Sequence, residues 1–406
     1  MRLSSDDLPM FFAPHHAALA DRLRAAAPAL EGVELPGAHA TETERDRAAA
    51  RALADAGLFE LVVPLEHASS APGTASASAA AFLAGPASGA SSSASSGSAA
   101  GSAPGSGPGP GAAFAAGAVP GSGSASGSPS ASGSASGSVS GSGSGSVLGS
   151  GAGAAMLSSA VSHSAVGGGP VLDTRALCLA REMLGYVSAR ADSIFAVQGL
   201  GTHSLALAGN QAQRAHLKAF ARGAGIAAFA LTEPEAGSDV AAIATRAAPT
   251  ADGYRLDGDK LFISNLGIAD HATVVATTEP ALGGAGLTAF WVPLDAPGVT
   301  VKPMTAIAAH PIGALELRGV ELPASAKIGE VGQGMKLALT TLDAFRVSVG
   351  AAAVGMARRA FDEALRFVTR RSQFGKPLAE QPLVQAHLAD MLVDLDAARL
   401  LVLRAA

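Results

Sequence analysis

The sequence predicts an α+β protein of several domains: an N-terminal helical domain, a middle antiparallel β domain and an incomplete C-terminal helical bundle. Three observations predict this order. Apolar residues recur at helical spacing before residue 225 and after residue 330, short β-rich runs lie between, and a Gly/Ser/Ala-rich stretch interrupts the first helical part. The predicted ranges are 1–67 and 171–224 for the two helical parts, 68–170 for the low-complexity linker, 225–330 for the β domain and 331–406 for the first two helices of the bundle.

The composition excludes several classes of protein. A net charge of −5 gives no overall attraction to nucleic acid or to an anionic membrane surface. The single cysteine, Cys178, excludes an intramolecular disulfide framework and is typical of a reducing compartment. Residues 1–10 carry two aspartates and no apolar core, unlike a secretory signal, and no run of 18 strongly apolar residues stands out. We therefore expect a cytoplasmic protein that does not insert into a membrane.

A long stretch of low complexity interrupts the first helical part. Two amphipathic helices are predicted before it, and helical spacing resumes at 177–184 and 194–207. Between Glu66 and Asp173 there is no Asp, Glu, Lys or Arg, and Gly, Ser, Ala and Pro dominate. Such a segment buries too little apolar surface to offset its ordering entropy, so we expect a disordered linker or insertion. A tethering spacer, a tolerated insertion and a misread gene segment all fit this composition.

Short β-rich runs follow residue 225. Residues 254–256 and 261–263 flank Asp257-Gly258, a dipeptide that favours a two-residue type I′ turn, so we predict a hairpin here. Further runs at 273–277, 287–292 and 299–304, and alternating apolar residues over 315–322, predict more strands. Their regular spacing, with Gly and Pro between them, favours an antiparallel domain over a βαβ array.

Helical spacing returns after residue 334. Apolar residues from Phe345 to Ala364, Val349 and Met356 among them, are predicted to share one face of a long helix, which a Gly-Lys-Pro triplet at 375–377 ends. A second helix starts near residue 382 and carries apolar residues as far as position 402. Because both helices present apolar faces, we expect further helices to cover them, and the sequence stops at residue 406 before any such helix.

The most specific string of residues is Leu-Thr-Glu-Pro-Glu-Ala-Gly-Ser-Asp at 231–239. Pro234 and Gly237 impose a tight loop, and Gly237 lets the backbone approach a flat ring closely. Thr232 and Ser238 supply hydroxyls that donate or accept hydrogen bonds as a ligand requires. From spacing alone, the favoured interpretation is a turn between two strands in which Asp239 caps the local backbone.

This string resembles the signature of the acyl-CoA dehydrogenase family, and the order of helices, strands and helices agrees with it. The resemblance runs from about Phe11 to Ala406 without the low-complexity stretch, and three further segments carry it. They are Lys-Leu-Phe-Ile-Ser-Asn at 260–265, Asp-Ala-Phe-Arg at 343–346 and Arg-Ser-Gln-Phe-Gly-Lys-Pro-Leu at 371–378.

The resemblance implies FAD as the cofactor. It places Thr232 by the reactive N5 edge of the isoalloxazine and Phe262 where the family often has a stacked Trp. The residues that it implies in FAD binding are Phe229, Leu231, Thr232, Gly237, Ser238, Phe262, Ser264, Arg371, Gln373 and Phe374. The last three would reach the FAD of a neighbouring subunit. Ordinary strand packing also explains Phe262 and Ser264, and a favourable charge at a helix end also explains Arg371.

The resemblance also implies a CoA thioester as the substrate, with contacts from Ser238, Asp343 and Arg346. Asp343 and Arg346 lie one helical turn apart, so a surface ion pair of small value explains them as well. The implied partners are an electron-transferring flavoprotein or a similar acceptor and further copies of the chain, as a dimer or tetramer. The implied setting is fatty acid metabolism.

The implied reaction is the α,β-dehydrogenation of an acyl-CoA to a 2-enoyl-CoA, in which a carboxylate takes the α-proton and the β-hydrogen leaves as hydride to flavin N5. The family's usual base, a Glu, would lie beyond Ala406, and its alternative position holds Phe345, which accepts no proton. The catalytic base is therefore unassigned, and we expect the 406 residues alone to be inactive. A non-catalytic member that binds flavin or partner subunits only is the alternative, and oxidases or monooxygenases of the same fold stay open.

Two other patterns do not predict sites. Residues 329–336 look like a phosphate-binding loop, but a Walker A loop needs Gly-Lys-Ser/Thr, and here Met335 separates the glycine from the lysine. His15, His16 and His310 have no partners at metal-ligand spacing, so no metal site is predicted.

Overall fold

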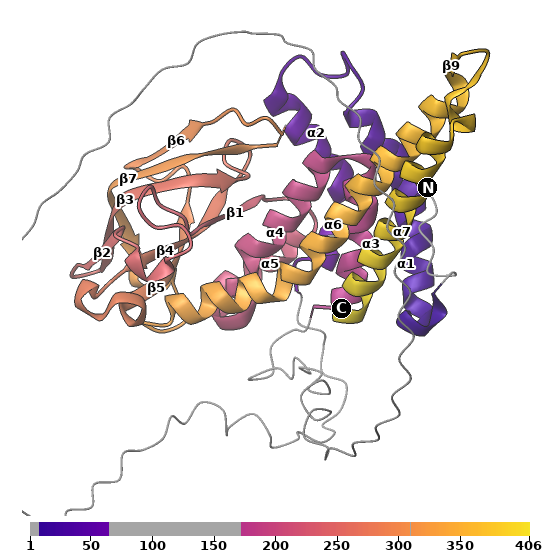
Figure 1. Cartoon of the computed structure of the whole chain (residues 1–406). Helices are drawn as coiled ribbons and strands as arrows, with labels where there is room; N and C mark the ends of the chain where they lie inside the picture. Colours follow the sequence, from indigo (N-terminus) through magenta and orange to yellow (C-terminus); the bar gives the residue numbers. More distant parts are fainter. Residues whose placement is uncertain (1–7, 65–171, 309) are drawn as a thin grey trace, which may run out of the picture. The chain divides into compact units, whose positions relative to one another are not determined.

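The structure, a computed structural model, describes residues 8–64, 172–308 and 310–406 (Figure 1). Its N-terminal part contains the helices α1 (Pro14–Val33), α2 (Glu42–Asp55), α3 (Thr174–Val187), α4 (Ala189–Ala208) and α5 (Gln211–Ala221), with the 3-10 turns η1 (Pro9–Phe11) and η2 (Leu58–Leu61). The helices predicted on either side of the low-complexity stretch are confirmed. The predicted linker itself lies outside the described residues.

Polar side chains mark where these helices begin. The Thr41 hydroxyl accepts a hydrogen bond from the Glu44 N–H, and the Glu44 carboxylate accepts one from the Thr41 N–H, which caps α2 reciprocally. The Asp173 carboxylate caps α3 by accepting hydrogen bonds from the N–H groups of Arg175 and Ala176. These bonds satisfy N–H groups that have no partner inside a helix.

The segments before and after the low-complexity stretch share one hydrophobic core. Both segments contribute fully buried side chains to it, including Leu23, Leu53, Phe59, Leu177, Met183 and Phe195. Burial of each large apolar side chain contributes roughly 1.5–3 kcal/mol to stability. The five N-terminal helices therefore share one core although residues 56–173 separate α2 from α3 in sequence.

The middle part forms a mixed sheet of eight strands. They are β1 (Ala227–Ala230), β2 (Arg246–Pro249), β3 (Gly253–Ser264), β4 (His271–Thr277), β5 (Leu287–Pro293), β6 (Val299–Pro303), β7 (Ile312–Pro323) and β8 (Lys327–Ile328), with the 3-10 turns η3 (Val240–Ala242), η4 (Pro280–Gly286) and η5 (Ala324–Ala326). The order is β6-β7-β3-β2-β4-β5-β8, with β1 beside β4. Most neighbours are antiparallel as predicted, whereas β1 and β2 each pair with β4 in parallel.

The hairpin predicted at Asp257-Gly258 is wrong. Both residues lie inside β3, which pairs with β2 on one side and with β7 on the other. The register against β7 shifts between Leu256 and Gly258, and Gly258 has a φ of 156°. A Cβ at Gly258 would lie 2.7 Å from the Cα of Thr245, so only glycine allows this close approach. The dipeptide therefore marks a β-bulge in a long strand.

Two long helices follow the sheet. α6 (Gly334–Arg370) and α7 (Pro382–Ala405) are joined by the short strands β9 (Ser372–Gln373) and β10 (Lys376–Pro377) and the turn η6 (Leu378–Glu380). By length and composition, α6 could cross a membrane, since its most apolar 18-residue window has a mean hydropathy of 1.4. A buried core helix meets the same criteria, and 44% of that window is buried. Packing of α6 against α3 and α4 buries part of these apolar residues.

The predicted apolar face of α6 is buried only in part. Phe345 and Ala352 are buried, whereas Val349 and Met356 are 56% and 41% exposed. The buried side follows α3, which approaches α6 closely near Ala352 and Gly355. An apolar groove of about 640 Å³ runs between α6 and α7. The order of N-terminal helices, a middle β-sheet and two C-terminal helices confirms the predicted α+β fold class.

The crossing of α3 and α6 predicts opposite effects for two helical glycines. A Cβ on Gly355 would lie 2.0 Å from the carbonyl oxygen of Glu182, whereas no heavy atom lies within 4 Å of a Cβ on Gly32 in α1. We expect Gly355→Ala to lower the free energy of unfolding by about 1–3 kcal/mol through overpacking. Gly32→Ala is expected to raise it by up to ~1 kcal/mol, because alanine favours a helix. Urea unfolding of both variants tests this, and equal stability of the two would contradict the close crossing.

Candidate functional site

The 231–239 loop follows β1 and turns back on itself. The Glu233 N–H donates to the Ala236 carbonyl oxygen at 2.9 Å, and the Ala236 N–H donates to the Glu233 carbonyl oxygen at 3.3 Å. Pro234 is the first residue between them, where its fixed φ suits a tight turn. The rigid turn predicted from the sequence is therefore present.

A buried ion pair holds this loop to β3. Lys260 Nζ lies 2.7 Å from the Glu233 Oε1 and donates a second hydrogen bond, of 3.1 Å, to the Leu231 carbonyl oxygen. The Glu233 carboxylate also accepts hydrogen bonds from the N–H groups of Ala244 at 2.7 Å and Thr245 at 3.1 Å. Lys260 is 1% exposed and Glu233 is 6% exposed. The carboxylate thus joins three segments: the loop, β3 and the chain that leads into β2.

The environment of the pair keeps Glu233 ionised. Burial alone would raise the pKa of this carboxyl, but the Lys260 charge and its hydrogen bonds outweigh burial and lower the pKa below its usual value. Burial lowers the pKa of Lys260 to about 8, although Glu233 opposes that shift. Sequence reasoning placed Glu233 in the loop without a role and quoted Lys260 only within a motif, because the pairing of two segments 27 residues apart leaves no local pattern.

The same attachment places Thr232 beside Phe262. The Leu261 N–H donates to the Thr232 carbonyl oxygen at 2.9 Å. The register of β3 against β7 shifts between Lys260 and Ile263, and Phe262 has a φ of 57° and is 58% exposed. A positive φ at a bulky residue is costly and is often kept at functional sites. The bulge therefore presents the Phe262 ring outward, next to the loop.

Of the other residues predicted to bind FAD from β1, the 231–239 loop and β3, some are buried in the core and others are accessible to a ligand. Leu231 is buried in an apolar cluster with Ala338 and Met335 of α6, and Phe229 packs partly against the same cluster. Thr232 and Ser264 are half-buried, and Ser238 is exposed. A Cβ on Gly237 would meet no heavy atom within 4 Å. Within residues 8–64, 172–308 and 310–406, nothing therefore fills the space beside the Gly237 backbone.

Asp343 and Arg346 form the predicted one-turn pair on α6. Arg346 Nη2 lies 3.0 Å from Asp343 Oδ1, and their side chains are 71% and 60% exposed. An exposed pair of this kind contributes about 1 kcal/mol or less to stability. Both groups are therefore accessible to a ligand from solvent.

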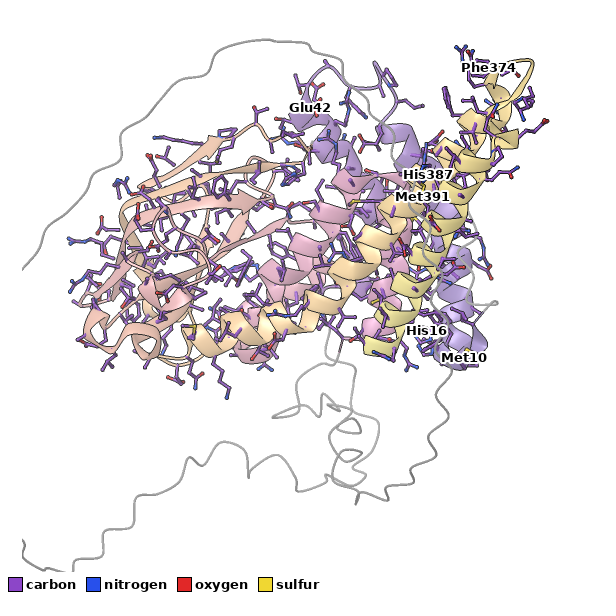
Figure 2. All side chains as sticks on the ribbon, viewed as in Figure 1. Met10, His16, Glu42, Phe374, His387 and Met391 are labelled. Atoms are coloured by element: carbon purple, nitrogen blue, oxygen red, sulfur yellow. The ribbon has the colours of Figure 1, made fainter. Side chains whose placement is uncertain are left out.

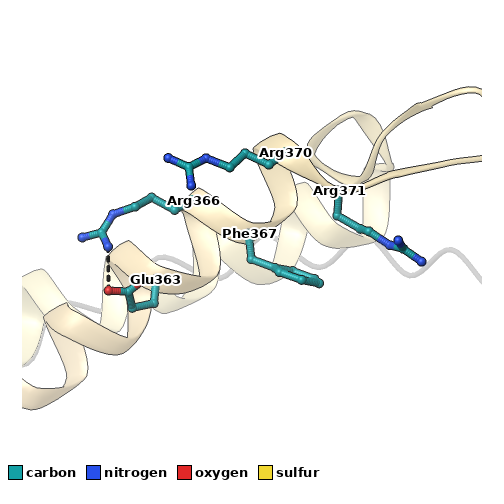
Figure 3. Close-up of a pocket in the computed structure, with 5 residues that line it drawn as sticks. All are labelled: Glu363, Arg366, Phe367, Arg370 and Arg371. Carbon is teal, nitrogen blue, oxygen red and sulfur yellow. Dashed lines mark hydrogen bonds and ion pairs between the residues drawn. The ribbon is translucent and has the colours of Figure 1, made fainter. Parts of the chain in front are cut away.

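Arg371, Gln373 and Phe374 lie at the far end of α6 and on the β9–β10 hairpin. Phe374 is 94% exposed with a φ of 54°, and Figure 2 shows it at the hairpin tip. Figure 3 shows Arg371 with the neighbouring side chains of α6, which are Glu363, Arg366, Phe367 and Arg370. Arg366 pairs with Glu363 at 2.5 Å, and Glu363 also pairs with Arg359 at 2.9 Å. This end of α6 is basic and carries exposed aromatic rings.

The length of α6 separates these residues from the 231–239 loop. Leu231 packs against Met335 and Ala338 in the first turns of α6, whereas Arg371 follows the last turn. A helix of 37 residues is roughly 55 Å long. The structure therefore brings Thr232, Phe262 and Ser264 together and does not bring Arg371, Gln373 or Phe374 to them within one chain.

Phe345 lies in the core between α4 and α6. It is 3% exposed, its ring meets the His203 ring edge-on at 5.8 Å, and a Cβ on Gly199 would lie 2.5 Å from it. Burial lowers the pKa of His203 to about 4, so this imidazole is neutral. Neither side chain is placed to exchange a proton with a ligand.

A cluster that the sequence analysis missed joins α1 to α3. The Nε2 atoms of His15 and His16 each lie 3.0 Å from Asp173 Oδ2, and Figure 2 labels His16 at the start of α1. His16 Nδ1 accepts the Ala13 N–H at 2.9 Å, so the neutral ring carries its proton on Nε2 and donates it to Asp173. A metal would need a lone pair at that Nε2. We therefore interpret the cluster as a hydrogen-bonded join between helices.

Two family models match the chain. The acyl-CoA dehydrogenase middle domain matches residues 228–320, and the acyl-CoA dehydrogenase C-terminal domain matches residues 332–406. These parts of the chain belong to the acyl-CoA dehydrogenase family. The resemblance read from the 231–239 string is thereby confirmed, and the 231–239 loop, β3 and α6 all fall in the matched residues.

Curated relatives and solved structures agree with the family models. The chain is 40% identical over 243 residues to the probable acyl-CoA dehydrogenase FadE25 of Mycobacterium tuberculosis, covering 59% of this chain and 62% of that protein. It is 37% identical over 244 residues to a short-chain specific acyl-CoA dehydrogenase of Megasphaera elsdenii, covering 59% and 63%. The structure of butyryl-CoA dehydrogenase from Megasphaera elsdenii superposes with a TM-score of 0.55 at 35% identity, covering 57% and 62%. The chain thus spans less than two thirds of the length of these relatives.

FAD is the cofactor of this family, and the solved neighbours include a glutaryl-CoA dehydrogenase from Mycobacterium smegmatis in complex with FADH2 and an FAD complex of PigA. The residues of this chain fit an isoalloxazine. Phe262 offers an exposed ring face, Thr232 and Ser264 offer hydroxyls, and the space beside Gly237 is open. No single one of these residues identifies the family, because ordinary packing or hydrogen bonding also explains each of them.

The buried pair predicts non-additive effects of mutation. Lys260→Met leaves a buried carboxylate without its countercharge, and Glu233→Gln leaves a buried ammonium. We expect each to lower the free energy of unfolding by about 3–5 kcal/mol, and the double variant to cost clearly less than their sum. FAD retention should fall with each single change, because the loop loses its attachment to β3. Urea unfolding and the FAD content per chain measure both effects.

The matched control is the exposed pair of Lys302 and Glu316, whose side chains are 58% and 30% exposed. Lys302→Met is expected to change stability by about 1 kcal/mol or less and to leave FAD retention unchanged. Additive effects of Lys260→Met and Glu233→Gln would contradict the role given to the pair.

Proposed function

We propose that this chain supplies the FAD-binding and thioester-binding residues of a flavin-dependent acyl-CoA dehydrogenase. In the proposed reaction an acyl-CoA loses one hydrogen from its α carbon and one from its β carbon and becomes a 2-enoyl-CoA. The observation that carries this proposal is the fixed placement of Thr232 beside the exposed Phe262 ring by the Lys260–Glu233 pair. The relatives named as acyl-CoA dehydrogenases support it.

FAD, when bound, accepts the β-hydrogen together with its electron pair. The chain's own residues hold the ring system and orient it. Thr232 and Ser264 offer hydroxyls to the polar edge of the ring system, and Phe262 offers a face for stacking. Because the Lys260–Glu233 pair already fixes the loop, these groups need little reorganisation when ligands bind.

The proposed contacts with the CoA thioester come from Ser238, Asp343 and Arg346. The Ser238 hydroxyl is exposed at the end of the loop. Arg346 pairs with Asp343 at 71% exposure, so its guanidinium has donors left for a phosphate or carbonyl oxygen. These positions suit recognition of the carrier rather than of the acyl chain.

The proton acceptor is not found among these residues. Glu233 accepts hydrogen bonds from Lys260 and two backbone amides, and Phe345 has no basic atom and lies in the core. Removal of a general base slows such a step by roughly 10²–10⁴-fold. The lack of a basic atom at Phe345 favours a second candidate function, which is the binding of flavin or partner subunits without catalysis.

We propose that a second copy of the chain completes the FAD site. Phe374 and Arg371 lie at the exposed end of α6, roughly 55 Å along the helix from the residues that support the 231–239 loop. One chain therefore cannot offer both groups to one flavin. In a homodimer or homotetramer, the α6 end of one copy would meet the 231–239 loop of another copy, so that both groups reach one flavin. Gln373 lies on the same hairpin as Phe374.

We further propose an electron-transferring flavoprotein or a similar acceptor as the redox partner, in the acyl-CoA turnover of fatty acid metabolism in the cytoplasm. A solved neighbour at 33% identity and a TM-score of 0.55 comes from a study of the electron transferring flavoprotein of Acidaminococcus fermentans. The single cysteine, Cys178, supports a reducing compartment, because the sequence has no second cysteine for an intramolecular disulfide.

Anaerobic titration of the FAD-loaded protein with saturated acyl-CoA thioesters of several chain lengths tests the proposal. We expect the visible flavin band to shift on binding and any bleaching by the 406 residues alone to be slow, since Phe345 supplies no base. Thr232→Val, which keeps the side-chain shape and removes the hydroxyl, should weaken FAD retention or alter bleaching. Thr300→Val on β6 is the matched control. A flavin spectrum unchanged by every thioester would contradict the proposal, and a shift without any bleaching would favour the non-catalytic function.

A further inference from the structure

β1, the strand that leads into the 231–239 loop, pairs with β4 alone among the strands that the structure describes. The backbone of Ala227, its first residue, is bonded by two side chains from elsewhere. The Ala227 N–H donates to Gln198 Oε1 at 2.8 Å, and the Ala227 carbonyl oxygen accepts from Asn265 Nδ2 at 3.0 Å. Two amide side chains therefore take the place of a neighbouring strand at the start of β1.

Gln198 lies on α4 and is fully buried. Its Nε2 donates to the carbonyl oxygens of Phe220 and Gly225, each at 2.9 Å, while its Oε1 accepts from Ala227. These three partners fix which end of the amide is the oxygen. α4 comes close to β1 because of Gly201, where a Cβ would lie 2.7 Å from the Cβ of Ala227. Gln198 thus joins α4, the end of α5 and β1.

Asn265 follows Ser264, the last residue of β3, and is fully buried as well. Its Nδ2 donates to the carbonyl oxygen of Ala227 and, at 3.4 Å, to that of Ile194 on α4. Both neighbours are acceptors, so the amide nitrogen must face them. The Asn265 N–H donates in turn to the carbonyl oxygen of Pro311, just before β7, at 2.8 Å. Asn265 therefore joins the end of β3 to three other segments.

The backbone of Asn265 is itself unusual. Its φ of 68° lies in the left-handed region, which asparagine tolerates better than most residues. Among the described residues other than glycine, Phe262, Asn265 and Phe374 have a positive φ. The family resemblance assigns Phe262 and Phe374 to FAD binding, and costly backbone conformations are often kept at functional sites. Asn265 is the member of this set that has no assigned role.

Two attachments to the β3 segment hold β1 and its loop. At one end the Leu261 N–H donates to the carbonyl oxygen of Thr232, and at the other end Asn265 holds Ala227. Ser264 lies between these attachments in sequence, directly before Asn265. Because a segment held at one end is free to shift at the other, both attachments together fix Thr232 relative to Ser264.

We propose that Asn265 and Gln198 are positioning residues of the FAD site. By holding the backbone of Ala227, they set the spacing between the hydroxyls of Thr232 and Ser264 that face the ring system. This inference rests on the proposed function, because it concerns how the same FAD-binding residues are held. Both amides are fully buried and act through the backbone of β1 without touching the flavin.

Two substitutions in the full chain test this role. Asn265→Gly removes the amide and permits the same positive φ, and Gln198→Met keeps the length of the side chain but removes its strong hydrogen-bonding groups. We expect each to weaken FAD binding by roughly tenfold, which corresponds to the loss of one hydrogen bond. The visible spectrum of the FAD that still binds should change too, because the two hydroxyls approach the ring with altered spacing. Fluorescence titration of the FAD-free protein and absorbance measure both effects, under conditions in which circular dichroism shows each variant to be folded.

Gln213→Met is the matched control. Gln213 on α5 is 5% exposed, and its Nε2 donates to the carbonyl oxygens of residues 325–327 at 3.0, 3.2 and 3.1 Å. The same substitution therefore removes a buried amide of the same kind. It should lower the midpoint of urea unfolding, as Gln198→Met does, and leave FAD affinity and the flavin spectrum unchanged. Equal weakening of FAD binding by these two substitutions would indicate general destabilisation and would overturn the positioning role.

Asn265→Asp separates the hydrogen bond from the backbone conformation. Aspartate keeps the shape of asparagine and tolerates a positive φ, but an ionised carboxylate has no donor for the Ala227 carbonyl oxygen. FAD affinity should fall as it does in Asn265→Gly, and a loss in Asn265→Asp alone would overturn the role of Asn265. FAD affinity and spectrum unchanged in Asn265→Gly and Gln198→Met would overturn the positioning role alone. Failure of the unaltered protein to bind FAD at all would overturn the proposed function and this inference with it.

Discussion

The candidate site depends on the buried ion pair between Lys260 and Glu233. A single carboxylate accepts hydrogen bonds from Lys260 Nζ and from the N–H groups of Ala244 and Thr245, so it ties the 231–239 loop to β3 and to the start of β2. Two charges buried this deeply are stable only while each satisfies the other. Because of this mutual dependence, the position of Thr232 relative to the β3 bulge is fixed before any ligand arrives.

The second constraint is the length of α6. Its first turns pack against Leu231, and its last turn leads to Arg371 and the exposed Phe374, roughly 55 Å away. The residues that the family resemblance assigns to one cofactor therefore fall into two groups at opposite ends of one helix. This division follows from helix geometry, and it is the reason for the proposal that a second copy completes the FAD site.

The sequence predicted what depends on local pattern. Apolar spacing gave the helices and most strands, and the 231–239 string gave the turn at Pro234. The prediction from sequence failed where contacts between distant segments determine the local structure. Asp257-Gly258 favours a turn locally, yet strands on both sides of β3 hold it extended as a bulge. Lys260 and the cluster of His16 with Asp173 were missed as well, because partners 27 and 157 residues away leave no local signal.

Amide hydrogen exchange of the FAD-free protein measures the central constraint most directly. The account predicts slow exchange at Ala244, Thr245 and Leu261 in the unaltered protein, since their N–H groups bond to the Glu233 carboxylate or to the 231–239 loop. In Lys260→Met, these three amides should exchange much faster while amides in the β4–β5 pairing keep their protection. Unchanged exchange at the three amides would contradict the claim that this ion pair holds the site together.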